Sequence, residues 1–264
     1  VAITLAMEAC RRAVGITLVA LLALFLVHCL FGPYFPGPLN QAAVDPMRLV
    51  DHLFFTTQGL YGSITGISAT YVLMFVLLGA VLEKARGGDL FMNLAAGLMG
   101  QQPGGPGKAA VLASGLFGSI SGAAVANVYA TGTFTIPLMI KTGFKRQFAA
   151  AVEAVASASG QLVPPIMGSA AFLIADFTQT PYVQVAKAAA LPAFLYLFAV
   201  YFMVHLETKK FDLPAMELDQ VRKARREIRL DIHMLLVLVV VVILLIDRTT
   251  PFYAAFAGVV CTVL

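Results

Sequence analysis

Long apolar stretches alternate with short polar segments along the whole chain. The stretches lie at roughly 13–31, 64–82, 109–140, 147–175, 184–206, 230–247 and from 251 onward. Most of them approach or exceed the ~20 residues with which an α-helix crosses the hydrocarbon layer of a membrane. The pattern predicts an all-α polytopic membrane protein in which transmembrane helices are joined by polar loops.

Composition agrees with this reading. Hydrophobic residues make up 59% of the 264 residues and charged residues only 12%, and the mean hydropathy is +0.86. Soluble domains carry about 25% charged residues. We therefore expect the chain to lie in a lipid bilayer.

The basic residues gather on one predicted side of the membrane. Outside four clusters, the basic residues are Arg48, Lys187 and Arg248. The clusters are Arg11 and Arg12; Lys84, Arg86 and Lys108; Lys141, Lys145 and Arg146; and Lys209, Lys210, Arg222, Lys223, Arg225, Arg226 and Arg229. Because Lys and Arg concentrate in cytoplasmic loops, all four clusters are predicted to be cytoplasmic. The net charge of +4 thus reflects topology and predicts no nucleic-acid partner.

The segment between Lys108 and Lys141 is predicted to enter the membrane and return. Both lysines belong to cytoplasmic clusters, so the chain between them must cross an even number of times. Two full crossings need about 40 residues, more than separate the two lysines. A re-entrant helical hairpin over 109–140 fits better.

The tip of this hairpin combines glycines with polar side chains. It reads GSISGAAVANVYATG over residues 118–132. Gly118 and Gly122 allow a tight turn and close approach of the backbone. The polar side chains that can supply ligands or donors are Ser119, Ser121 and Asn127. Discontinuous helices of secondary transporters hold ions and substrates in this way; the alternative is a GxxxG helix-packing contact.

The next apolar segment, 147–175, is predicted to cross once and to be broken in its middle. A proline inside a helix removes a hydrogen bond and costs about 3 kcal/mol. Pro164 and Pro165, close to Gly160, should therefore unwind a turn. The freed carbonyls need partners, and a cation can be one. Gln161 adds an amide oxygen and two donors.

Glu153 is the acidic residue predicted to lie well inside a span. An intramembrane carboxyl group is costly and marks a functional site by default. It precedes the Gly160 break by about two helical turns, so we expect it, with Thr131, to support the site. The alternative is that Glu153 lies nearer the cytoplasmic end and pairs with Lys145 or Arg146.

Two interrupted elements that follow each other in sequence predict a transport site.

An intramembrane hydrolase is disfavoured, because a serine nucleophile needs a positioned base. The histidines His28, His52, His205 and His233 all fall at span ends, loops or interfaces. A passive channel stays open as an alternative.

Longer motifs resemble a known family. ISGAAVANVYATGTFTIPLMIKTGF and EAVASASGQLVPPIMGSAAF resemble the large permease subunit (DctM-like) of the tripartite ATP-independent periplasmic (TRAP) transporters. The likeness covers about 55–215. The chain looks like the fused permease of the TAXI branch, and MEACRRAVG at 7–15 looks like the joint between its small-subunit and large-subunit parts.

This resemblance implies a permease component of a secondary, ion-coupled importer of organic acids such as small carboxylates, working by alternating access. Sodium would be the coupling ion, with no other cofactor. A periplasmic TAXI-type binding protein would deliver the substrate, and a small-subunit-like membrane part would be fused upstream. The complex would lie in the cytoplasmic membrane of a bacterium or archaeon. A channel, or an ion-coupled transporter without a binding protein, is the alternative.

By the same resemblance, the hairpin and the broken helix would form an ion and substrate site. Its residues would be Ser119, Ser121, Gly122 and Asn127 from the hairpin, and Gly160, Gln161, Pro164 and Pro165 from the broken helix. Sodium would bind at Ser119, Ser121, Asn127 and Gly160. The sequence departs from the family at Ala123, where members often have serine, and at Ser159, where they often have glycine.

Four parts follow from these interpretations. Residues 1–50 would be the end of the small-subunit-like part with a linking span and an external loop, and 51–206 the first repeat of the large permease part. Residues 207–229 would be a cytoplasmic loop with a solvated helix of mixed charge. Residues 230–264 would begin a truncated second repeat, so that the chain is a piece holding one half of an inverted-repeat transporter.

Overall fold

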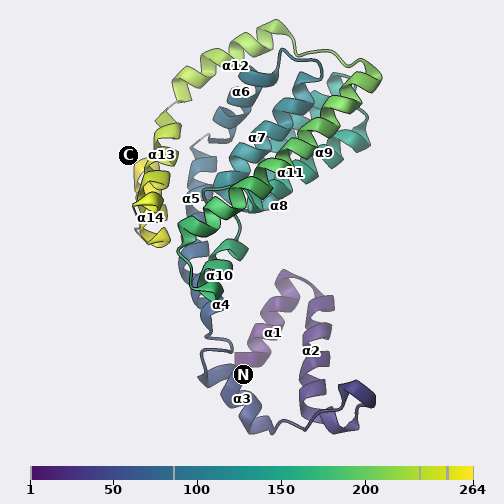
Figure 1. Cartoon of the computed structure of the whole chain (residues 1–264), viewed down its shortest axis with the longest axis vertical. Helices are drawn as coiled ribbons and strands as arrows, with labels where there is room; N and C mark the ends of the chain where they lie inside the picture. The colour runs from purple at the N-terminus through teal and green to yellow at the C-terminus, as the bar shows by residue number, and fades with distance from the viewer. Residues whose placement is uncertain (1, 86, 232, 248–249, 264) are drawn as a thin grey trace. The chain divides into compact units, whose positions relative to one another are not determined.

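The computed structural model describes residues 2–85, 87–231, 233–247 and 250–263 (Figure 1). Arg86 and Arg248 of the charge analysis lie outside the described residues, as do the two chain ends. Within the described ranges all regular secondary structure is helical, which confirms the predicted all-α class. The chain divides into two compact units between Ile67 and Ser68.

The first unit is a set of short helices. They are α1 (Ala2–Ala13), α2 (Ile16–Phe31), the 3-10 turns η1 (Gly32–Tyr34) and η2 (Gly37–Leu39), α3 (Pro46–Phe55) and α4 (Ser63–Ile67). Asp45 caps α3 by accepting a hydrogen bond from the Met47 N–H at 3.4 Å. Helix α3 packs against α1 within this unit.

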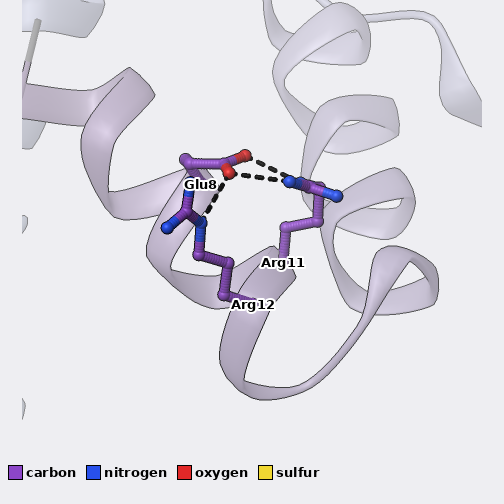
Figure 2. Close-up of polar contacts among 3 residues, drawn as sticks. All are labelled: Glu8, Arg11 and Arg12. Carbon is purple, nitrogen blue, oxygen red and sulfur yellow. Dashed lines mark hydrogen bonds and ion pairs between the residues drawn. The ribbon is translucent and has the colours of Figure 1, made fainter.

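The first basic cluster is organised around Glu8 on α1, as Figure 2 shows. Arg11 donates hydrogen bonds from Nε and Nη2 to the two carboxylate oxygens at 2.7 Å, and Arg12 Nε donates to one of them at 2.9 Å. These two arginines lower the pKa of Glu8 to about 2. Because the cluster is exposed, its ion pairs orient the arginine side chains but contribute little to the stability of the fold.

The second unit is a larger helical bundle. It comprises the π-helical turn η3 (Ser68–Val72), α5 (Leu73–Lys84), α6 (Gly87–Met99), α7 (Gly105–Ser121), α8 (Ala124–Lys141), α9 (Arg146–Ala158), η4 (Ser159–Gln161), α10 (Ser169–Thr178), α11 (Tyr182–Phe211), α12 (Leu218–Asp231), α13 (His233–Ile246) and α14 (Pro251–Val263). Helix α7 lies at its centre and contacts α5, α6, α8, α9 and α11 (Figure 1).

Small residues bring α7 close to its neighbours. Nearly every residue of α7 is buried, and most are Gly, Ala or Ser. Interfaces between helices in membranes are enriched in such residues because they let backbones approach. Around α7 the hydrophobic core includes Val111 of α7, Met139 of α8, Val152 of α9 and Val204 of α11.

Among the residues that the structure describes, three helices are long and apolar enough to span a membrane: Ile16–Tyr34, Ser63–Lys84 and Tyr182–Phe211. The bent pair Leu218–Arg229 and His233–Ile246 meets the same test when taken together. These segments support the polytopic prediction.

Lys108 is buried, unlike the exposed loop lysine that its cluster suggests. It is 2% exposed, and its Nζ donates to Gln102 Oε1 at 3.3 Å and lies 5.7 Å from the centre of the Tyr201 ring. The Tyr201 hydroxyl donates to the same amide oxygen at 2.9 Å. Lys108 therefore connects the start of α7 to α11.

The helix expected in 207–229 is present as α12, but it is not fully solvated. Val221 and Ala224 pack against Ala96 of α6. Arg225 Nε donates to the Gly97 carbonyl at 3.1 Å, while Arg222 is exposed. The apolar positions of α12 recur at helical spacing, so one face is buried while the other keeps its basic residues exposed.

Candidate functional site

The hairpin turn is formed by Gly122 and Ala123. Helix α7 ends when Gly122 adopts a left-handed conformation, φ 62°, and its N–H bonds the Gly118 carbonyl at 2.9 Å. A Cβ at Gly122 would lie 2.2 Å from the Met167 carbonyl oxygen. Glycine is thus required both for the backbone conformation and for contact with the broken helix.

The predicted break is also present. Helix α9 ends at Ala158, η4 adds one 3-10 turn, and α10 begins only at Ser169. Pro164 and Pro165 lie in the non-helical segment between them, as expected from their missing N–H donors.

Hydrogen bonds to other parts of the protein hold much of the unwound backbone in place. The Ile166 N–H donates to the Ser119 carbonyl at 3.1 Å, and the Gly168 N–H donates to the Gln161 carbonyl at 3.0 Å. The hydroxyl of Tyr182 on α11 contacts the carbonyl oxygens of Pro165, at 2.9 Å, and of Ile166. The break is therefore anchored by the hairpin tip on one side and by α11 on the other.

Gly118 and Gly160 bring the two elements into backbone contact. A Cβ on Gly118 would lie 2.6 Å from the Gly160 Cα, and a Cβ on Gly160 would lie 2.7 Å from the Gly118 Cα. The packing reading of Gly118 therefore holds. It is a packing glycine, and the surface on which it packs is the break itself.

Ser121 carries an unmatched polar atom at the tip. Within the described residues, its Oγ is the buried side-chain oxygen or nitrogen without a hydrogen-bond partner. Leaving such a group unsatisfied costs about 1–3 kcal/mol. By contrast, the neighbouring Ser119 donates its hydroxyl proton to the Leu116 carbonyl at 2.7 Å. Gln161 lies exposed beside the tip.

Asn127 is fully buried and uses its carboxamide within the protein. Its Nδ2 donates to the Ser114 carbonyl at 2.8 Å and to the Ser157 carbonyl at 3.3 Å. Its Oδ1 lies 3.3 Å from the Thr131 hydroxyl. Asn127 of α8 thus connects α7 and α9.

Glu153 lies among hydroxyl groups and is 0% exposed. Its Oε1 accepts from Ser114 and Ser157 at 3.0 Å each, and from Thr131 at 2.5 Å. Its Oε2 accepts from Thr135 at 2.5 Å. The alternative pairing with Lys145 or Arg146 is wrong, since both side chains are exposed and these hydroxyl groups occupy the carboxyl group.

Residues 1–264 match the family described as "Tripartite ATP-independent periplasmic transporter, DctM component". The chain belongs to this family. A DctM component is part of a transporter, so the prediction that the chain is not an enzyme is confirmed.

Several large permease proteins of TRAP transporters are similar to this DctM-family chain. The C4-dicarboxylate protein DctM of Rhodobacter capsulatus is 37% identical over 34% of the chain and 21% of its own length. The sialic acid protein SiaM of Vibrio cholerae is 28% identical over 59% of the chain and 36% of its own length. The isethionate permease protein DctMQ of Oleidesulfovibrio alaskensis is 32% identical over 42% of the chain and 18% of its own length.

The matched regions thus span well under half the length of these relatives. The family and its membrane-embedded, multi-pass character are established for this chain. Its transport activity, substrate and partners are taken up below as proposals.

One residue that contacts the broken segment was missed by reasoning from sequence. Tyr182 follows Pro181 at the start of a helix, like many aromatic residues near membrane surfaces, and only the structure places its hydroxyl on the broken segment. A cavity of about 230 Å³ beside the break, lined by Pro164, Pro165 and Tyr182, has mainly apolar walls. It does not include Ser121.

Proposed function

We propose that this chain supplies one side of the ion and substrate site of a secondary, ion-coupled importer of organic acids, with sodium as the coupling ion. The site lies where the α7–α8 tip meets the break after α9. The observation that carries the proposal is the buried, unpartnered Ser121 oxygen at this junction.

The chemistry of the tip suits a small hard cation. Helix α7 ends there, and the C-terminal end of a helix carries partial negative charge. Ser121 Oγ can act as a neutral oxygen ligand, and so can Ser119 Oγ, since its proton is already given to Leu116. The Gly160 carbonyl is the expected ligand from the broken helix. Sodium needs only such oxygen ligands, so the donor set fits.

The same junction suits a carboxylate beside the cation. Helices α8 and α10 both begin there, and neither has a side-chain cap hydrogen bond at Ala123 or Gly168. Helix N-termini carry partial positive charge and present free N–H groups. The exposed Gln161 adds amide donors. Discontinuous helices of secondary transporters use both kinds of helix end in this way.

Coupling to sodium is energetically sufficient. One charge moving through 100 mV yields about 2.3 kcal/mol, and a tenfold concentration gradient adds about 1.4 kcal/mol per ion. Two sodium ions would supply roughly 7 kcal/mol. That supports steep accumulation of an organic acid.

The proposal also covers the partners, the membrane and the topology of the protein. A periplasmic TAXI-type binding protein delivers the substrate, and a small-subunit-like part is fused upstream. The protein lies in a bacterial or archaeal cytoplasmic membrane with the 207–229 segment on the cytoplasmic side, hairpin 109–140 re-entrant and 51–206 forming one of two inverted repeats. The relatives' names, which include C4-dicarboxylate and sialic acid, support an acidic substrate.

Uptake by the full-length permease in proteoliposomes tests this function. Ser121→Leu fills the ion position and Gln161→Ala removes the amide, so each should abolish sodium-driven uptake while membrane insertion stays normal. Asp219→Asn, which changes a charged residue with a 95% exposed side chain, should leave uptake unchanged. Equal loss of insertion and uptake would indicate packing instead of ligand binding, and uptake that never exceeds equilibrium would indicate a channel.

A further inference from the structure

We infer that Glu153 and Asn127 are positioning residues that set the geometry of the ion site without touching the ion. This inference rests on the proposed function and changes the role expected for Asn127 from ligand to support. It is carried by buried polar contacts that run from Glu153 to Asn127, whose amide lies against Gly118, one turn below the hairpin tip.

The series begins where three helices meet at one carboxyl group. Glu153 lies on α9, and its two oxygens accept hydrogen bonds from Ser114 of α7, Thr131 and Thr135 of α8, and Ser157 one turn further along α9. Both arms of the hairpin are therefore fixed to the first half of the broken helix by one side chain.

Thr131 lies between Glu153 and Asn127, and its single hydroxyl proton can be donated to one of them at a time. Its hydroxyl lies 2.5 Å from Glu153 Oε1, 2.8 Å from the Asn127 carbonyl and 3.3 Å from Asn127 Oδ1. Asn127 in turn donates to the carbonyls of Ser114 and Ser157, one on each neighbouring helix. Glu153 and Asn127 thus connect the same three helices at successive levels.

The series ends at the backbone contact below the tip. Asn127 Nδ2 lies 2.7 Å from the position that a Cβ of Gly118 would take, and Gly118 lies against Gly160. Two residues beyond Gly160, the chain leaves its helix, and Ile166 then bonds Ser119. The separation of Ser119 and Ser121 from Gly160 therefore depends on how closely α7, α8 and α9 are held.

Both side chains are poorly placed to act as ligands themselves. Glu153 and Asn127 are each 0% exposed. The amide hydrogens of Asn127 point to two carbonyl oxygens. An NH2 group that donates hydrogen bonds cannot coordinate a cation. Asn127 Oδ1 faces the Thr131 hydroxyl at 3.3 Å, and Glu153 lies about two helical turns before Gly160.

A sodium titration of the purified full-length permease tests this inference. The thermal unfolding midpoint is followed while NaCl replaces choline chloride, so that the sodium concentration for half of the shift can be compared between variants. Glu153→Gln should raise that concentration about tenfold, because the amide keeps one acceptor oxygen but puts an NH2 donor in place of the other, so that the hydroxyl groups of α7, α8 and α9 can no longer all donate to this side chain. Asp219→Asn is the control for loss of an acidic residue and should match the wild type.

A matched pair on Thr131 separates positioning from general stability. Thr131→Ser keeps the hydroxyl and should retain sodium affinity, whereas Thr131→Val keeps the size, removes the hydroxyl and should weaken sodium binding several-fold. A lower unfolding midpoint in choline with unchanged sodium affinity in both Glu153→Gln and Thr131→Val would overturn the inference. If Glu153→Gln does not fold, Thr135→Val, which removes one donor to Oε2, takes its place.

The same titration distinguishes a failure of the proposed coupling ion from a failure of the positioning role. A wild-type midpoint that does not respond to sodium contradicts the proposed coupling ion. A wild-type response that is identical in Glu153→Gln and Thr131→Val contradicts only the positioning role.

Discussion

Gly118→Ala provides the sharpest perturbation of the junction between hairpin and broken helix. The added methyl group would lie 2.6 Å from the Gly160 Cα and 2.7 Å from Asn127 Nδ2. Both neighbours are fixed, one as backbone and the other by two hydrogen bonds. The substitution therefore has to push α7 away from η4.

The size of the effect follows from these distances. Carbon atoms in contact prefer a separation of about 3.5–4.0 Å, so the two backbones must move apart by about 1 Å. Overpacking of this kind costs typically 1–3 kcal/mol. For a bundle of about 200 residues, that corresponds to a fall in the unfolding midpoint of roughly 2–12 °C. A comparable loss at the ion site would weaken sodium binding by about 5–150-fold.

The assay compares Gly118→Ala with Gly88→Ala in the full-length permease. At Gly88 a Cβ would lie 3.7 Å from the Phe117 ring, an ordinary contact, so this control should retain the wild-type midpoint and sodium affinity. Each variant is heated in detergent, the surviving monodisperse fraction is measured by size exclusion, and sodium-driven uptake is measured in proteoliposomes. Normal stability and uptake in Gly118→Ala would refute the backbone contact on which the site geometry depends.

Three further predictions concern other parts of the chain. Gly122→Ala, with a Cβ 2.2 Å from the Met167 carbonyl and a φ of 62°, should lose uptake, and a variant with normal sodium-driven uptake would argue against the tight turn. Tyr182→Phe leaves the Pro165 carbonyl without its hydroxyl partner and should destabilise the protein by about 1–3 kcal/mol in thermal unfolding, more than Tyr196→Phe, whose hydroxyl bond to Val155 is exposed. Glu8 should titrate near pH 2 in a carbon-13 NMR experiment. Since its pKa is lowered on folding, the contribution of its ion pairs to stability is present above the ordinary Glu pKa and is lost as the pH falls toward 2. A titration midpoint near the ordinary value would contradict the arginine contacts.

The two interruptions could be predicted because each has a strong local cause. Charge clusters around Lys108 and Lys141 left too few residues for two crossings, and the chain does turn at Gly122. The pair Pro164 and Pro165 cannot continue a helix, and the helix stops before them. Both arguments need only the covalent chemistry and the length of the segment.

The contacts across the site could not be predicted, because they depend on which helices become neighbours. Asn127 was assigned to the ion by its place in a motif, whereas its partners are carbonyls of α7 and α9. Glu153 had a predicted supporting role, but its hydroxyl partners come from three helices. Likewise, nothing in the sequence distinguished Lys108, which is buried, from Lys84, the exposed lysine of its cluster.

Thallium, a heavy substitute for sodium, provides the most direct test that the hairpin tip and the helix break together bind a cation. A cryo-EM map of the full-length permease in thallium acetate should show, relative to a choline control, density within coordination distance of Ser121 Oγ and the Gly160 carbonyl. That density should disappear in Ser121→Leu. Cation density confined to another part of the protein, or an unbroken helix through Pro164 facing lipid, would contradict the account.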